Sequence, residues 1–447
     1  MLTSYNNCPG AFSRAAGVRF RTALMLPLLA ISLAACDTDK LLDVEDNDVA
    51  TPVSLENRGA LSVLHAAGIG DFQVAYTGSN AAEGQINLSG IFTDEFLFAE
   101  TFPTRLEVDM RSIQEQNATT SGLMRDIQRA RGSSDFSSAK FATLAPADVR
   151  RAELMNLAGF AIVIMGENYC SGVPISSLTD AGELVFGQPR TTAQLWDDAQ
   201  AKFDSAIVIA GAAGASGATQ LNLARVGRGR ALLNKGDFNG AAAAVAGVAS
   251  SFNYLIFNSV GTARQNNGVW VFQRLGNRWT VADREGINGL PYISDRDPRT
   301  PTTPAPPPGL GFDGSTPLIF QNKYPLRDSD VPLANGVEAR LIEAEAALRA
   351  GNVAGFTTGL NAARSAQGQA AIVAAGTPDA RRDQLFKERA YSLWLTSHRL
   401  GDLRRLIRQY SRTQDQVFPT GPYPKGGSYG TDVNIIIPFD EKNNPNF

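Results

Sequence analysis

The chain has 447 residues, a formal net charge of −3 and 43% apolar residues. That apolar share is enough to build a folded core, so an intrinsically disordered protein is excluded. The length exceeds one typical core and predicts one large domain or two closely packed ones. The 41 lysine and arginine residues are scattered without a basic stripe, which argues against nucleic-acid binding.

Histidine and cysteine are too scarce to support most metal or catalytic sites. The chain has two histidines, His65 and His398, which leave little room for a His-based metal centre or catalytic triad. Of the three cysteines, Cys170 follows an apolar run, so we expect a buried and unreactive thiol. No disulfide framework within the mature chain is possible, and we expect neither a metal nor a cofactor.

Residues 1–35 have the features of a secretory signal peptide. Arginines precede the apolar stretch 23–33, which is too short for a transmembrane helix of about 20 residues. The run Leu33-Ala34-Ala35-Cys36 resembles a bacterial lipobox, which implies that Cys36 becomes the first mature residue and carries a lipid anchor. The alternative is an ordinary signal peptide that happens to end near a cysteine. Residues 36–57 are acidic and predict a solvated tether.

The body, residues 58–447, is mostly helical in pattern. We expect Thr192 to cap a helix over 193–209, followed by a helix over 222–235, the turn Gly236-Asp237 and a helix over 239–248. A similar unit follows later, where a helix over 338–349 ends at Gly351-Asn352. An alanine-rich helix, a Gly-Asp/Asn turn and a second helix resemble the tetratricopeptide unit. The expected hairpins cover about 192–250 and 337–365.

A segment of different character, residues 251–335, separates the two hairpins. It scatters aromatic rings among Gly, Asn and Pro, and five of the eight residues over 301–308 are proline, which excludes a helix there. We expect a loop-rich lobe on a helical scaffold, where binding sites usually lie.

The C-terminal part, residues 381–447, begins with a helix over 381–394 and a basic amphipathic helix over 400–410, before ending in coil or short strand. On the basic helix we expect Arg404, Arg405 and Arg408 to form salt bridges with the body. We expect Asp402 to cap the helix or to pair with Arg405 or Arg399.

Several segments, taken in order, carry a resemblance to a known family. They are Cys36 with the opening 41–52, the stretch SDRDPR over 294–299, KYP over 323–325, and the most characteristic stretch over 388–405, which includes HRLGDLRR. The closing Phe418-Pro419 also fits. This set resembles the SusD/RagB family of outer-membrane nutrient-binding lipoproteins over nearly the whole mature chain. One departure is Thr396-Ser397, where the family commonly has an acidic residue and glycine.

The resemblance implies a mainly α fold, with tetratricopeptide-like helical hairpins as a scaffold and an irregular loop-rich lobe that binds the ligand. It also implies a lipid-anchored position on the outer face of the outer membrane. There the protein would capture an oligosaccharide, or sometimes a peptide, for a partner TonB-dependent transporter (SusC-like), without catalysing a reaction.

The lobe contains the residue types that bind sugars. A sugar ring packs its C–H face on an aromatic ring while polar neighbours bond its hydroxyls. The candidate ligand-binding residues are therefore Trp270, Trp279, Tyr292, Arg274 and Asn277. Core packing is the alternative for each ring, and it is favoured for Tyr324 and Trp394. Phe98 and Phe102, near Arg105, are possible contributors from another part of the chain.

Two other functions remain open from the residues alone. The first is a helical-repeat scaffold of the cell envelope that binds another protein. The second is a glycoside hydrolase that uses carboxylates such as Asp94, Glu95 and Asp109, although sequence does not supply their separation. The pattern Gly309-x-Gly311-x-x-Gly314 follows a proline run rather than a strand, so a phosphate cradle is not expected.

Overall fold

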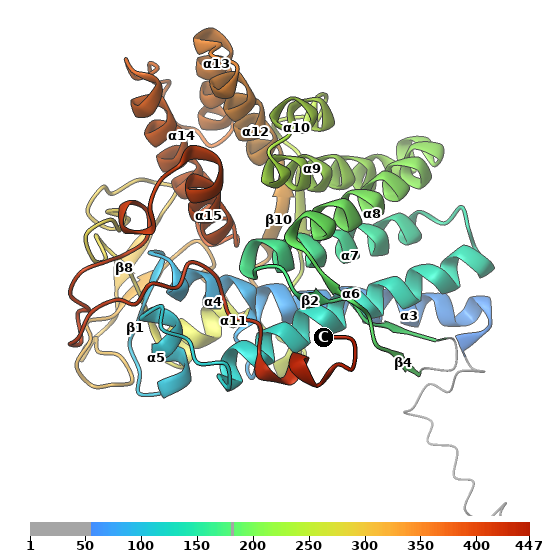
Figure 1. Ribbon diagram of the computed structural model, residues 1–447, viewed down its shortest axis with the longest axis horizontal. Helices are drawn as coiled ribbons and strands as arrows, with labels where there is room; N and C mark the ends of the chain where they lie inside the picture. The colour runs from blue at the N-terminus through green and yellow to red at the C-terminus, as the bar shows by residue number, and fades with distance from the viewer. Residues whose placement is uncertain (1–54, 180–182) are drawn as a thin grey trace, which may run out of the picture. The chain divides into compact units, whose positions relative to one another are not determined.

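The computed structural model describes residues 55–179 and 183–447 (Figure 1). Cys36, the predicted signal peptide and nearly all of the predicted tether lie outside the described residues. The fold is mainly α, as the sequence predicts, and the described strands pair only as two-stranded antiparallel sheets. No helix within the described residues combines the length and the apolar character needed to cross a membrane.

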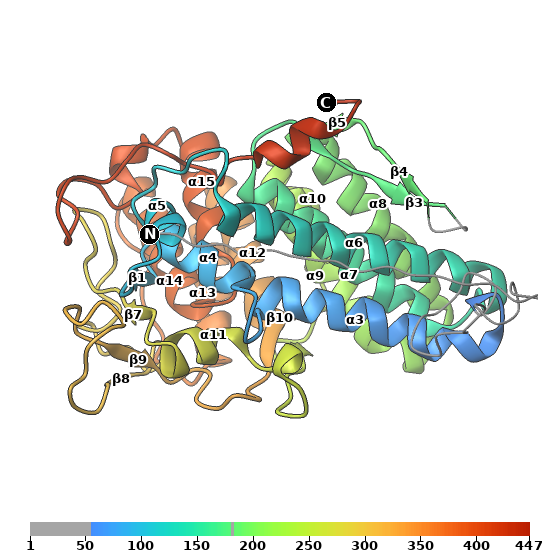
Figure 2. The same cartoon turned by 90° about the horizontal axis from the view of Figure 1, so that it is seen from below.

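Helices packed side by side form the scaffold. The first half supplies α3 (Leu61–Thr77), α4 (Gly84–Phe92), α5 (Pro103–Asp109), α6 (Ala118–Leu144) and α7 (Val149–Asn168). The helical hairpins follow as α8 (Thr192–Ala212), α9 (Ala218–Lys235), α10 (Phe238–Val245), α12 (Gly336–Arg349) and α13 (Val353–Ser365). Each of α6 to α10 packs on the helix before it, and α10 packs on α12 (Figures 1 and 2). The two units that resemble tetratricopeptide repeats are therefore neighbours in space.

The same local chemistry closes the turn of both units. Gly236 and Gly351 adopt φ angles of 91° and 71°, which lie in the left-handed region that favours glycine. The next residue then caps the following helix, because Asp237 and Asn352 each accept a hydrogen bond from the backbone N–H three residues on. The Gly-Asp/Asn signal in the sequence therefore marks a real turn in each unit.

The lobe leaves the scaffold and returns to it at one place. Strand β6 (Asn253–Ile256) pairs antiparallel with β10 (Val331–Asn335), so the two ends of the insertion lie side by side. Between them lie α11 (Gly268–Trp270), a π-helical turn (Val271–Leu275), β7 (Trp279–Val281), β8 (Thr302–Pro304) and β9 (Ile319–Gln321). The proline-rich run contains β8 and no helix, as the sequence predicts. Strand β1 (Phe96–Phe98) pairs with β7 and so joins the first half of the chain to the lobe.

Three details differ from the sequence predictions. The cap of α8 is Thr191 rather than Thr192, and it forms a capping box with Gln194. Cys170 is exposed because α7 ends at Asn168, and its thiol donates to Oδ1 of Asn434 at 3.2 Å. The 27-residue helix α6 was not predicted, because serines and Arg131 occupy much of its buried face and conceal the apolar periodicity.

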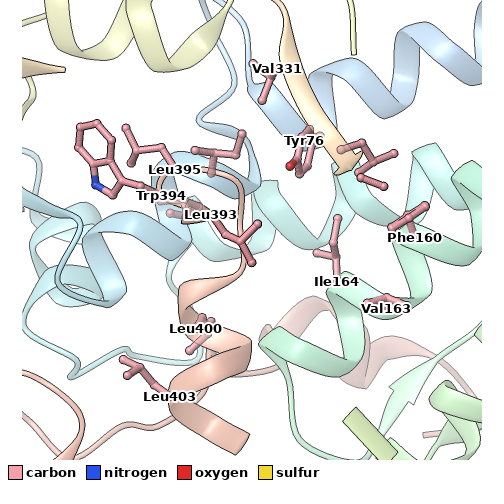
Figure 3. Close-up of a cluster of buried hydrophobic side chains, with 14 of the residues drawn as sticks. Tyr76, Phe160, Val163, Ile164, Val331, Leu393, Trp394, Leu395, Leu400 and Leu403 are labelled. Carbon is pink, nitrogen blue, oxygen red and sulfur yellow. The ribbon is translucent and has the colours of Figure 1, made fainter. Parts of the chain in front are cut away.

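The core gathers around the helix pair α14 (Pro378–Ser392) and α15 (Arg399–Tyr410) and the bend that joins them. Figure 3 shows Leu393 and Leu395 of this bend and Leu400 of α15 in one cluster with side chains of α3, α7 and β10, while the indole of Trp394 points away from those side chains. These rings and branched chains are almost fully buried. Burial of this apolar surface, at about 25 cal/mol per Å², stabilises the packing of α15 on the scaffold.

Charged side chains inside this core are paired with one another. Arg405 donates from NH1 to Glu345 of α12 at 2.5 Å and from NH2 to Asp402 at 2.8 Å. The other oxygen of Asp402 accepts from Nε of Arg389 on α14 at 2.8 Å. Burial would raise the pKa of Asp402, but the two arginines outweigh it and hold that pKa well below its usual range. The predicted Asp402–Arg405 pair is confirmed.

The other arginines of this helix have different partners from those expected. Arg399 binds Asp94, with Nε at 2.6 Å from Oδ1 and NH2 at 2.8 Å from Oδ2, rather than Asp402. Among the residues that the structure describes, Arg404 has no salt-bridge partner, and it donates to backbone carbonyls at the end of α7, including that of Tyr169 at 2.9 Å. These carbonyls have no partner inside the helix, so Arg404 closes the C-terminus of α7.

Two buried carboxyl groups hold the C-terminal segment 418–430. Asp109 accepts a hydrogen bond from the hydroxyl of Tyr423 at 2.5 Å, and Glu285 accepts one from the hydroxyl of Tyr429 at 2.9 Å. Burial raises the pKa of Asp109 to about 7. Burial, together with the nearby Asp109 carboxylate, raises the pKa of Glu285 well above its usual range. Both groups therefore keep a proton to a higher pH in the folded protein than in the unfolded chain.

The raised pKa values of Asp109 and Glu285 predict that the folded protein becomes less stable as the pH rises. Between the ordinary pKa of 3.8 and about 7, folded Asp109 retains a proton that the unfolded chain has released. The free energy of unfolding therefore decreases as the pH increases across that window. Asp109→Asn should flatten the decrease, measured by urea unfolding at a series of pH values. The control Glu115→Gln, at an exposed site, should keep the slope of the wild type, and an unchanged slope in Asp109→Asn would contradict this assignment.

Candidate functional site

A cavity of about 260 Å³ lies where the lobe meets the loop that follows α3. Three parts of the chain contribute to it: the α3–α4 loop, α5 and the π-helical turn with the residues just after it. The lining residues are Asn80, Ala81, Arg105, Val271, Phe272, Leu275, Gly276 and Arg278. The cavity therefore combines apolar surface with amide and guanidinium donors, which is the chemistry of small polar ligands.

Aromatic rings and guanidinium groups are stacked at this cavity. Phe272 lies parallel to Trp279, with ring centroids 5.9 Å apart and an interplanar angle of 8°. The guanidinium of Arg105 lies 5.0 Å from the centroid of Phe272 and 4.7 Å from that of Phe102. The guanidinium of Arg278 lies over Phe272 at 5.8 Å. These cation–π contacts place both guanidinium groups over the aromatic rings.

A buried carboxylate fixes the two arginines relative to each other. The side chain of Glu100 is 1% exposed and accepts from NH1 of Arg105 at 3.0 Å and from NH1 of Arg278 at 2.5 Å. Glu83 accepts from NH2 of Arg105 at 2.6 Å. With its charge neutralised and its donors engaged, Arg105 is a rigid part of the cavity wall.

Backbone hydrogen bonds join the segments that carry these side chains. Phe98 of β1 lies opposite Trp279 of β7, and the N–H of Ala99 donates to the carbonyl of Arg278 at 2.8 Å. The N–H of Phe312 donates to the carbonyl of Asn277 at 2.9 Å. Asn277 has a φ of 52°, in the left-handed region that asparagine tolerates better than most residues. The tight turn at Asn277 therefore places Phe312 beside Arg278.

Exposed apolar side chains line the cavity or contact the arginines that line it. Phe102 is 49% exposed, Leu275 is 58% exposed and Phe312 is 63% exposed. The ring of Phe312 has the Arg278 guanidinium 5.7 Å from its centroid, and Phe102 has Arg105. Large apolar side chains that stay exposed beside a polar cavity mark a binding surface. An aromatic face next to hydrogen-bond donors can hold a sugar ring.

The structure places Trp279 and Tyr292, two predicted ligand contacts, in the core. Both side chains are fully buried, so a ligand cannot touch them in this structure. Trp279 supports Phe272 from behind, and Tyr292 stacks on Trp394 with centroids 6.0 Å apart. Tyr324 and Trp394 are also buried, as expected.

The other three sequence candidates lie next to the cavity-lining segment without lining the cavity. Trp270 is half-buried and donates from Nε1 to the carbonyl of Pro325 at 2.9 Å. Arg274 donates to the carbonyl of Gln321 at 3.0 Å and lies over the ring of Phe320. Asn277 positions Phe312 through its backbone. Their direct contact with a ligand stays a prediction.

The sequence did not single out Asn80, Phe272, Leu275, Arg278 or Phe312. Phe102 was a possible contributor, and Arg105 entered only as its neighbour. The signal in the sequence was a large apolar residue beside turn residues, with Gly and Asn at Leu275-Gly276-Asn277 and with Gly and Asp at Gly311-Phe312-Asp313-Gly314. Such a context predicts a tight turn, where a large apolar side chain often stays exposed.

A larger hollow of about 500 Å³ lies at the turn between α9 and α10. It contains no aromatic ring, and its cations are already paired, because Arg228 binds Asp204 and Lys235 binds Asp197. It is therefore a weaker candidate for a sugar site than the smaller cavity. Within residues 55–179 and 183–447, no group of three His, Cys, Asp or Glu side chains is arranged to hold a metal ion.

No protein-family model and no curated protein matches this sequence. Solved structures do match over most of the chain. A SusD-like carbohydrate binding protein from Bacteroides vulgatus has a TM-score of 0.63 at 14% identity, covering 88% of this chain and 97% of its own. Surface glycan-binding protein A from Bacteroides uniformis has a TM-score of 0.62 at 14% identity, covering 87% and 98%. A chitin-binding SusD homologue from Flavobacterium johnsoniae has a TM-score of 0.60 at 13% identity, covering 84% and 90%.

These matches show that the chain has the SusD/RagB fold. They confirm the mainly α architecture with a tetratricopeptide-like scaffold that the sequence predicts. At 12% to 14% identity they establish the fold, while the ligand has to be argued from this chain's own residues.

Trp279 and Phe312 provide a test of which aromatic residues belong to the core. Trp279→Ala should lower the free energy of unfolding by about 3–5 kcal/mol, because it removes a fully buried indole. Phe312→Ala should change it by no more than about 0.5 kcal/mol, because the ring is exposed. Urea unfolding of the two variants measures both values. Equal losses in both variants would contradict this division between core and surface.

Proposed function

We propose that this protein is an outer-membrane surface lipoprotein that binds a nutrient oligosaccharide and delivers it to a TonB-dependent transporter. The observation that carries the proposal is the cavity beside Arg105 and Arg278 with its exposed aromatic rim. The lipobox-like run ending at Cys36 supports the lipid anchor. Solved proteins with this fold include a laminarin binding SusD-like protein and a chitin-binding SusD homologue, which supports a glycan as the ligand.

The cavity favours binding over catalysis. A glycosidase needs one carboxylic acid and one carboxylate that both reach the scissile bond. The two carboxylates nearest to this role, Glu83 and Glu100, are held by Arg105 and Arg278 and do not line the cavity. Asp94 is bound by Arg399 in the core. The work of this site is therefore the selection and retention of a ligand.

Substitution of Phe312 tests the proposed site through glycan binding in solution. The wild-type body without its signal peptide should bind at least one oligosaccharide on a glycan array. Phe312→Ala should bind that oligosaccharide at least about tenfold more weakly, because it loses an aromatic face that packs on the sugar. Isothermal titration calorimetry measures the change. The control Phe439→Ala removes another exposed ring and should bind as the wild type does. Equal binding by all three proteins would contradict the site.

Co-purification tests delivery to a transporter. A tagged full-length protein, extracted gently from outer membranes, should bring down a TonB-dependent barrel in stoichiometric amounts. Cys36→Ala should leave the membrane fraction and lose that partner. Repeated absence of a barrel, with the protein still lipidated, would favour a stand-alone binder or an envelope scaffold. Retention of Cys36→Ala in the membrane would contradict the lipid anchor.

A further inference from the structure

We propose that the cavity selects uncharged glycans over acidic ones, and that Glu100 sets this preference. The proposal rests on the proposed function, because it names the class of glycan taken by the same site.

The charges at the cavity cancel. Arg105 and Arg278 carry two positive charges, and Glu83 and Glu100 carry two negative ones, all joined in one network. Glu100 is the centre of that network, because it is buried and binds both arginines. A carboxylate or sulfate on the ligand would therefore meet no surplus positive charge, and it would lose its hydration as it entered.

The donors that remain suit hydroxyl groups. Nε, NH1 and NH2 of Arg105 are all directed at Glu83 or Glu100. Arg278 uses NH1 for Glu100, and its side chain is 33% exposed, so part of the guanidinium faces the cavity. Asn80 adds a side-chain amide to the lining. A hydroxyl can accept from Arg278 and donate to the amide oxygen of Asn80, whereas a carboxylate only accepts and leaves that oxygen without a donor.

Cationic side chains near the cavity are also engaged by other residues of the protein. Lys425 is bound by Asp313, next to Phe312, and Arg264 is bound by Asp71 at 2.5 Å. Arg274 donates to the carbonyl of Gln321, and burial lowers its pKa. Lys425 and Arg264 therefore add no unpaired positive charge at the rim, and a long acidic chain would gain little attraction from them.

The size of the cavity fits a short part of a glycan. A volume of about 260 Å³ lies below the range of about 300–1,000 Å³ that is usual for whole drug-sized ligands. A sugar unit in the cavity would have Phe102 and Phe312 on its flanks for the neighbouring units. Both contacts are apolar and independent of ligand charge.

Glu100→Gln tests the proposal. The amide is similar in shape but leaves the network with one net positive charge. The probes are a neutral β-glucan hexasaccharide and an oligouronate of equal length, measured by calorimetry at low and high salt. The wild type should bind the neutral probe at least about tenfold more tightly, with little salt dependence. Glu100→Gln should bind the oligouronate about tenfold more tightly than the wild type does, in a salt-sensitive way.

Two further variants keep the test decisive. Glu115→Gln removes one exposed negative charge away from the cavity and should leave both affinities unchanged. Glu83→Gln makes the same charge change at a more exposed member of the network and replaces Glu100→Gln if circular dichroism shows that the latter is unfolded.

The outcomes separate the two proposals. The charge selection would be overturned if the wild type preferred the oligouronate. It would also be overturned if a folded Glu100→Gln or Glu83→Gln variant bound the oligouronate no more tightly than the wild type does. Either result would leave glycan binding intact. Failure of the wild type to bind any glycan on the array would overturn the proposed function and the charge selection together.

Discussion

The buried pairing of Arg405 with Glu345 and Asp402 is the interaction on which the rest of the structure depends. It joins α12 to α15, and Asp402 extends it to α14 through Arg389. All four side chains are almost without solvent contact, so the loss of one partner would leave an uncompensated charge in the core. These ion pairs therefore fix the position of α14 and α15 against α12 of the repeat scaffold.

Buried ion pairs also connect helix α15 to the candidate site. Arg399 at the start of α15 binds Asp94, which lies just before β1, and β1 pairs with β7 of the lobe. Glu100 then follows β1 and binds the two arginines of the cavity. A chain of buried ion pairs and one short sheet thus connects the scaffold to the cavity. A site held in this way loses little conformational freedom on binding, which favours affinity.

The parts of the fold that sequence analysis predicted depend on local chemistry. Gly236-Asp237 and Gly351-Asn352 specify turns and caps that need no distant partner, so the hairpins could be placed. Proline excluded a helix around residues 301–308 for a similar reason. Helix α6 was not predicted, because its buried face is rich in serine and includes Arg131, which binds Asp135 on the same helix. Only packing against α3 and α7 makes that face a core surface.

The sequence by itself determined the order of hairpin, lobe and hairpin and the aromatic and polar composition of the lobe, because residue type and spacing act locally. The tertiary structure decided which aromatic residues a ligand can reach. Trp279 lies in a strand whose three residues are all buried, while Phe312 is held outward by the turn at Asn277. Aromatic residues close together in sequence do not reveal which face of the lobe they occupy. The pairing of β7 with β1, from almost two hundred residues earlier, settles that choice.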